Sequence, residues 1–174
     1  AGGWGVAESA DSIINSPAEE CAPAITYQGD RLFFERADAT GKKDLYVSAW
    51  NGSSWSEPEN VGPPVNTPDA SETKPFVTAS GDTLFFVRRS DIYIATRNGS
   101  GWNAPTLFSA AINTPNDETS PCLSADGREF FFTSDRPGGY GWMDIYVSTW
   151  DGSGWGAPRN LGPNVNTSDN EWYC

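Results

Sequence analysis

The sequence is poor in the residues that carry most catalytic and metal chemistry. Its 174 residues include no histidine, one methionine and three cysteines, and its aromatic segments contain no obvious nucleophile. The cysteines Cys21, Cys122 and Cys174 lack the paired CxxC spacing of a zinc or redox site. The sequence allows a disulfide with one thiol left over, although buried apolar thiols are the simpler interpretation.

Long hydrophobic runs and an excess of basic residues are also missing. No apolar run approaches the roughly 20 residues needed to cross a bilayer, so we expect no membrane insertion. The chain has 11 basic and 23 acidic residues, and its net charge of −12 would repel nucleic acid and anionic membrane surfaces. It starts without Met and without a charged, apolar leader, as expected for a mature, processed or recombinant product.

Aromatic residues and glycine, in contrast, are plentiful. Aromatic residues make up 13% of the chain, and the apolar share of 37% comes close to the usual globular fraction once the 18 glycines are counted. This composition argues against disorder. The length suits one domain with a sizeable core, and we therefore predict a single folded domain over residues 1–174.

Several sequence markers recur with one shared period. An Asp-apolar-Tyr motif begins at Asp44, Asp91 and Asp144, with spacings of 47 and 53 residues. Tryptophan follows at the same intervals, closing NGSSW, NGSGW and DGSGW at Trp55, Trp102 and Trp155. Markers that keep the same spacing indicate an internal repeat, here over about 20–61, 72–108 and 118–161.

Each repeat resolves into four short strand candidates separated by turn residues. Apolar triplets such as Leu32-Phe33-Phe34 do not alternate and suit a strand covered on both faces. Asn-Gly or Asp-Gly pairs predict tight two-residue hairpins between the third and fourth strands. Four antiparallel strands every 45 to 55 residues or so are typical of β-propeller blades, and an immunoglobulin-like sandwich would not explain so regular a repeat.

The repeat is incomplete at both ends. GGWGVAES at the start matches a fourth strand, and VNTSDNEWYC at the end matches the approach to a first strand. We therefore predict an all-β propeller with three complete blades and split strands of a further one. Three blades are too few for a ring of roughly four to eight. The chain is then a fragment of a longer propeller, or copies associate, for example as a homodimer that closes a six-bladed ring.

The third unit, SPCLSADGREFFFTSDRPGGYGWMDIYVSTWDGSGWGAPRNLGPNVNT, closely resembles the WD-type repeat of TolB-like β-propellers. The resemblance covers nearly the whole chain. The second unit departs from it, because FFVRRSDIYI lacks the Pro-Gly-Gly loop, and the first unit has RADATGKKDLY in that place. The resemblance implies a periplasmic or secreted bacterial protein that binds other proteins or cell-wall partners. It implies no particular ligand, because propellers host both binding modules and enzymes.

An asparagine and then a glutamate recur before every predicted first strand. If these strands line the channel, the glutamates would form an acidic ring at one mouth that holds a cation, a basic peptide or a polar glycan. Alternatively, a side chain repeated in every blade accepts backbone hydrogen bonds in the connecting loop. Calcium is a variant of the first idea, since these side chains offer oxygen ligands, but the spacing follows no established calcium loop. The pairs are Asn15 with Glu20, Asn66 with Glu72, Asn113 with Glu118, and Asn166 with Glu171.

A second candidate site is the long loop between the second and third strands of the third unit. It holds Asp135, Arg136, Tyr140 and Trp142, and no other unit has its equivalent. An exposed aromatic pair with an arginine would suit a peptide or sugar contact. The aromatic residues could equally pack on the neighbouring blade. The repeated aspartates of the Asp-apolar-Tyr motifs are better explained as residues that fix their own turns than as catalytic acids.

The leading hypothesis is a non-catalytic module that binds a protein or glycan partner through the channel mouth and the blade loops. One alternative is a carbohydrate-active enzyme that uses two channel carboxylates, which would need one acid with a distinct environment. Another is an assembly element whose incomplete edges pair with another chain.

Overall fold

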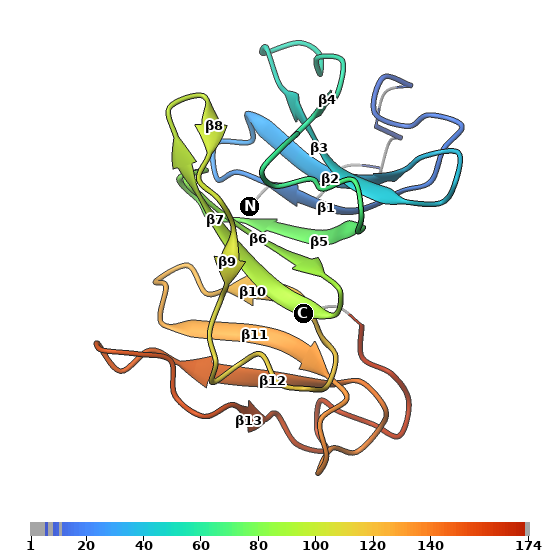
Figure 1. Cartoon of the computed structure of the whole chain (residues 1–174). Helices are drawn as coiled ribbons and strands as arrows, with labels where there is room; N and C mark the ends of the chain where they lie inside the picture. Colours follow the sequence, from blue (N-terminus) through green and yellow to red (C-terminus); the bar gives the residue numbers. More distant parts are fainter. Residues whose placement is uncertain (1–5, 7–8, 11, 173–174) are drawn as a thin grey trace.

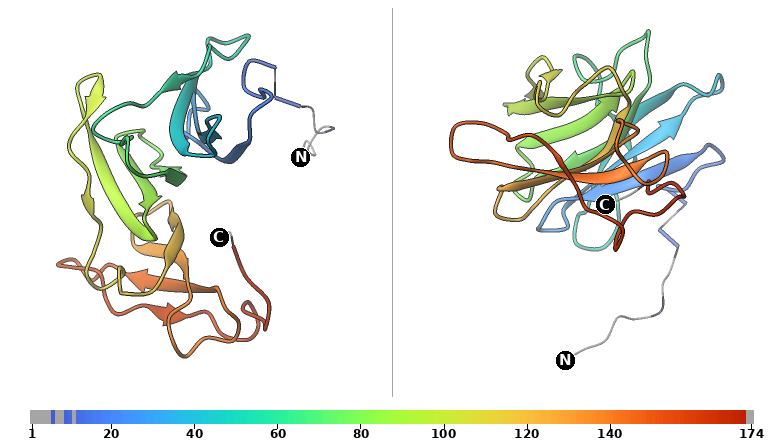
Figure 2. Two further views of the ribbon diagram at one scale, coloured as in Figure 1. Left: turned by 45° about the vertical axis from the view of Figure 1, so that its right-hand side comes forward. Right: turned by 90° about the horizontal axis from the view of Figure 1, so that it is seen from below.

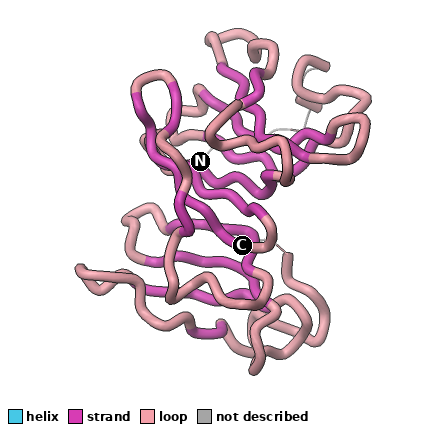
Figure 3. Tube along the Cα trace, in the orientation of Figure 1, coloured by secondary structure: helices cyan, strands magenta, loops and turns pink. Residues whose placement is uncertain are grey.

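The computed structural model describes residues 6, 9–10 and 12–172. Within these residues the chain forms strands, turns and loops and no helix, as Figure 3 shows. Accordingly, the described residues contain no helix long and apolar enough to cross a membrane. The predicted all-β class is confirmed.

The strands form three separate antiparallel sheets that follow one another along the chain (Figure 1). The first sheet runs in the order β1 (Glu20–Ile25), β2 (Arg31–Ala37), β3 (Lys43–Ala49) and β4 (Glu59–Asn60). The third runs in the order β10 (Glu118–Leu123), β11 (Glu129–Ser134), β12 (Asp144–Thr149) and β13 (Arg159–Asn160). Each is a four-stranded meander, the architecture of a propeller blade.

The second sheet has an additional short strand. It contains β5 (Glu72–Val77), β6 (Thr83–Arg88), β7 (Asp91–Asn98), β8 (Gly101–Trp102) and β9 (Thr106–Leu107). Both β8 and β9 pair with β7, β8 at its end and β9 near its start. β9 therefore takes the place that β4 and β13 hold in the other blades.

The hairpins differ from the prediction in all three blades. In the second blade Asn98 pairs with Gly101, so the turn has two residues as expected, but they are Gly99 and Ser100 rather than Asn98 and Gly99. In the first blade Trp50 pairs with Trp55 across a four-residue loop. The longer loop forms because Asn51 Oδ1 accepts hydrogen bonds from the backbone N–H groups of Ser53 and Ser54. Asp151 does the same in the third blade.

The core lies between the blades, and the second strands contribute large buried side chains to it. Phe33, Phe86 and Phe132, one from each apolar triplet, are fully buried. One apolar cluster joins the first and second blades and another joins the second and third. A fully buried Phe side chain contributes about 1.5–3 kcal/mol, so the strand that is covered on both faces holds consecutive blades together.

The three blades describe an arc, which Figure 2 shows in its left-hand view. The first strands β1, β5 and β10 lie on the concave side, and β5 contacts both of its counterparts. One face of the arc is formed by strand ends from all three blades: there the first strands begin, the second strands end and the third strands begin. We call this face the entry end. Both of the sites predicted from the sequence lie on it.

Candidate binding surface

At the entry end, the repeated glutamates are engaged inside the protein. Glu72 is fully buried and accepts hydrogen bonds from Thr67 N at 3.1 Å and Thr67 Oγ1 at 2.8 Å. It also accepts one from Arg88 Nε at 2.7 Å. Glu118, equally buried, is held by Thr114, Ser134 and Arg136, and Glu20 by Ser16 and Arg36.

The arginine partners are fixed on three sides. Arg88 lies over the rings of Phe86 and Tyr93, with distances of 5.3 and 4.9 Å to the ring centroids. Its Nη2 donates to Val65 O at 2.6 Å. Arg36 and Arg136 repeat this arrangement in their own blades. Three of the glutamates predicted to form an acidic ring are thus neutralised within the blades rather than presented to the channel.

Glu171 differs from the other three glutamates. It makes the same loop contacts, accepting from Thr167 N at 3.2 Å and from Thr167 Oγ1 at 2.7 Å. Its second oxygen, Oε2, is buried and has no hydrogen-bond partner among the described residues. The fourth glutamate therefore has its loop but lacks an arginine.

The asparagines predicted as binding residues clamp the backbone of a third strand. Asn166 Oδ1 accepts from Ile145 N at 2.8 Å, and its Nδ2 donates to Ile145 O at 3.0 Å. Asn113 holds Ile92 in the same way, at 2.9 Å for both bonds. Among the described residues no group of three or more Cys, Asp or Glu could hold a metal ion, and the side-chain oxygen of Asn113, a candidate calcium ligand, accepts a hydrogen bond from Ile92 N.

The long loop of the third blade separates its predicted residues into two groups. Asp135 Oδ1 accepts from Asp117 N at 2.8 Å, and Arg136 turns inward to Glu118. Tyr140 and Trp142 point outward and are 51% and 75% exposed. The structure thus leaves the aromatic pair available and uses the charged pair internally.

Asp144 fixes the loop that presents these rings. Its buried carboxylate accepts from Tyr140 N at 2.5 Å, Gly141 N at 3.0 Å and Asn160 Nδ2 at 2.9 Å. The glycines are required by close approach, because a Cβ at Gly139 would overlap the Asp144 carboxylate. This is the turn-fixing role expected for the repeated aspartates, and it holds the loop in place. Asp44 instead accepts from the side chains of Lys42 and Asn60, so the expectation is met at Asp144 and not at Asp44.

A third exposed aromatic residue lies beside the loop. Glu171 N donates to Met143 O at 2.8 Å, which brings the backbone around Trp172 next to that around Trp142. Trp172 is 49% exposed and borders a hollow of about 270 Å³ that Met143 and Arg89 also line. We call Tyr140, Trp142 and Trp172 the aromatic rim.

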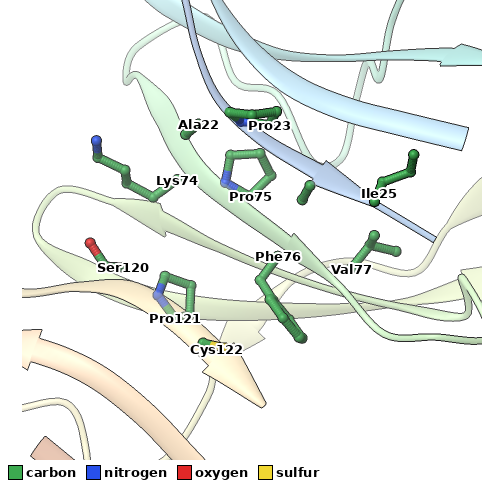
Figure 4. A pocket seen from close by; sticks show the side chains of 11 residues that line it. Ala22, Pro23, Ile25, Lys74, Pro75, Phe76, Val77, Ser120, Pro121 and Cys122 are labelled. Carbon is green, nitrogen blue, oxygen red and sulfur yellow. The ribbon is translucent and has the colours of Figure 1, made fainter. Parts of the chain in front are cut away.

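The concave face contains a further hollow that the sequence analysis missed. Each first strand carries a β-bulge, with the residue before a proline in the left-handed region: Ala22 at φ 51°, Lys74 at 50° and Ser120 at 52°. Together with the neighbouring residues these bulges line a hollow of about 400 Å³ (Figure 4). Such backbone outliers concentrate at functional sites. The available signal was the E-x-x-P motif, in which the residue before proline differs in every unit while its surroundings repeat.

Comparison with solved structures establishes the fold. TolB from Acinetobacter baumannii superposes with a TM-score of 0.60 at 15% identity over 89% of this chain and 35% of that one. A protein described as putative TolB from Agrobacterium tumefaciens gives 0.59 at 12% identity, over 90% and 55%. The chain has a TolB-like β-propeller fold.

Other propellers are similar to a comparable degree. The catalytic domain of the GH62 α-L-arabinofuranosidase from Coprinopsis cinerea gives a TM-score of 0.56 at 15% identity, over 86% of this chain and 52% of that one. This TolB-like propeller chain thus spans between about a third and just over half of the structures it matches. No protein-family model and no curated protein matches the sequence.

Proposed function

We propose that the chain is a non-catalytic binding module whose aromatic rim contacts a protein or glycan partner. The observation that carries this proposal is the exposure of Tyr140 and Trp142 on a loop that Asp144 holds by two backbone hydrogen bonds. Large apolar rings are costly to leave in water, and exposed apolar patches mark interaction sites.

The hydrogen bonds that hold the loop support a role in specific recognition. A contact residue that is already ordered loses little conformational entropy when it binds, which raises affinity. Trp, Tyr and Arg are also the residue types that dominate binding energy at protein interfaces. Arg89 borders the same hollow as Trp172, and its side chain is 65% exposed.

The proposed setting is the bacterial periplasm or the outside of the cell, on the strength of the TolB-like repeat and fold. We do not propose glycoside hydrolysis. Paired catalytic carboxylates must face a common substrate space, whereas Glu72 and Glu118 are buried and bound to arginines. The GH62 similarity concerns the fold alone.

The test is photo-crosslinking from position 142, combined with a polysaccharide-binding panel. A benzophenone amino acid replaces Trp142, envelope extract is the protein probe, and crosslinked species are identified by mass spectrometry. The proposal expects one saturable protein or glycan ligand whose affinity falls at least tenfold in Trp142→Ala. Trp150→Ala is the matched control, because Trp150 is also a partly exposed tryptophan, 39% exposed, and lies at the opposite end of the blade. Equal loss of binding in both variants, or no saturable ligand, would refute the proposal.

A further inference from the structure

The fourth glutamate reveals an incomplete charge pair at the edge of the arc. Glu20, Glu72 and Glu118 each combine a loop Ser or Thr with an arginine within two residues of the end of the second strand, 16, 16 and 18 residues further on. Glu171 has the same loop contacts from Thr167, yet its Oε2 is buried and unpartnered among the described residues. A buried carboxylate oxygen without a partner is unfavourable.

The three complete examples define the missing group. In each, the guanidinium lies between a Phe of the second strand and a Tyr of the third, within 4.8 to 5.3 Å of their ring centroids. The arginine also donates to a backbone carbonyl of the preceding loop, Ile14, Val65 or Ile112. A guanidinium matches this site because its fork of donors serves a carboxylate and a carbonyl at once.

A second copy of this chain offers no such group at the edge it would present. The first basic residue of the sequence is Arg31, so residues 1–30 contain no Lys or Arg. The same segment includes Glu8, Asp11, Glu19 and Glu20. Docking it against Glu171 would bring carboxylates together, which is unfavourable.

We propose that Glu171 is the docking site for an arginine-bearing β-hairpin of a further propeller blade. The partner hairpin packs beside Glu171 and supplies the missing donor to its Oε2. It places the arginine near the end of its first strand, a Phe two to four residues earlier, and a Tyr on its second strand. Trp172 of the aromatic rim directly follows Glu171, but this inference rests on the charge pairs and not on the exposed rings.

The test builds the missing hairpin from the chain's own sequence. Because Glu171 corresponds to Glu118, a copy of residues 122–161 added after Cys174 continues the fourth blade in register. Six proteins are compared by thermal unfolding: the extension with its copied Arg136 or with Gln at that place, each with Glu171, with Glu171→Gln or with Asp169→Asn. Asp169→Asn, a change to an exposed acid in the same loop, is the matched control.

The proposal expects coupling between the two positions. Replacing the copied arginine by Gln should lower the Tm by about 4 to 10 °C when Glu171 is present. The same change should have little effect in the Glu171→Gln background and its full effect in the Asp169→Asn background. Equal falls in all three backgrounds would overturn the proposal.

If the extended chains do not fold, binding of a separate peptide to the 174-residue chain tests the same pairing. The probe is a synthetic peptide with the sequence of residues 128–150 that carries a fluorescent label at its N-terminus, and fluorescence anisotropy of the label reports its binding to the 174-residue chain. We expect the peptide's affinity to fall at least tenfold when its arginine at position 136 becomes Gln, and again when the chain carries Glu171→Gln. No binding at about millimolar peptide, or equal affinity in all combinations, would reject the inference.

Discussion

The side chain of Asn66 forms hydrogen bonds with both the backbone N–H and the backbone C=O of Leu45, which lies 21 residues earlier in the chain. Its Oδ1 accepts from Leu45 N at 2.9 Å, and its Nδ2 donates to Leu45 O at 2.8 Å. Both groups are buried, so the clamp ties the start of β3 to the loop that leads into the next blade.

Removal of this clamp should destabilise the protein strongly. Asn66→Ala leaves the backbone N–H and C=O of Leu45 buried without partners, and each lost partner costs about 1–3 kcal/mol. We expect the free energy of unfolding, measured by urea denaturation, to fall by about 2–4 kcal/mol. Asn164→Ala removes an exposed asparagine from the corresponding loop of the third blade and should change the free energy of unfolding by less than about 0.5 kcal/mol. Similar values for both variants would contradict the clamp.

Breaking the buried ion pair of the second blade should have a larger effect. Arg88→Ala leaves the Glu72 carboxylate uncompensated in a fully buried position, and such changes cost about 3–5 kcal/mol. Arg89→Ala removes the adjacent, exposed arginine and should cost about 1 kcal/mol or less. Chemical denaturation of the two variants side by side makes the comparison, and a reversed order would show that Glu72 is not held as described.

The Pro-Gly-Gly loop should tolerate no side chain at Gly139. A Cβ there overlaps the Asp144 carboxylate, so Gly139→Ala must displace the loop and release the hydrogen bonds to Tyr140 and Gly141. We expect faster amide exchange at these two residues and about 1–3 kcal/mol lower stability. Gly154→Ala is the control, because an added Cβ meets nothing within 4 Å there. Unchanged exchange in Gly139→Ala would argue against a rigid loop.

The hairpin of the third blade should contribute a small pH dependence. Hydrogen bonds from Ser153 N, Ser153 Oγ and Gly154 N hold the pKa of Asp151 below its usual value. Because the folded-state pKa is lowered, this contribution is fully present above the unfolded value of about 4 and is lost as the pH falls through the folded value.

The first blade supplies the matched variant for this test. Asn51 makes equivalent bonds with an uncharged side chain, so Asp151→Asn should keep the turn and remove its pH dependence. Titration of Asp151 by NMR checks the pKa directly. A value at or above that of an unstructured aspartate would exclude this account.

The sequence predicted the fold because its signals are local and repeated. Apolar triplets around Phe33 and Phe132 indicate strands covered on both faces, and both residues are fully buried. The positions of the repeated glutamates were predicted, but their partners were not. Glu72 meets Arg88 because β5 and β6 pair in one particular register, and register depends on the bulge at Lys74, which local propensity does not reveal.

The loop residues show the same limit more sharply. Arg136 and Tyr140 both belong to a polar, glycine-rich segment, and nothing in their spacing indicates that one turns inward and the other outward. Arg136 turns inward because the buried carboxylate of Glu118 needs a cationic partner, which Arg136 supplies. The aromatic rim depends on Trp172 as well, which lies 30 residues from Trp142 in the chain and reaches it through the pairing of Glu171 with Met143.

The asparagine clamps have a consequence for how this molecule can evolve. Each clamp joins a blade to the loop that leads into the next blade, so the clamps connect neighbouring blades only. Insertion or deletion of one whole repeat preserves the remaining clamps, whereas an insertion or deletion that ends within a repeat disrupts one. Selection on such an array should therefore change its length in steps of a complete blade.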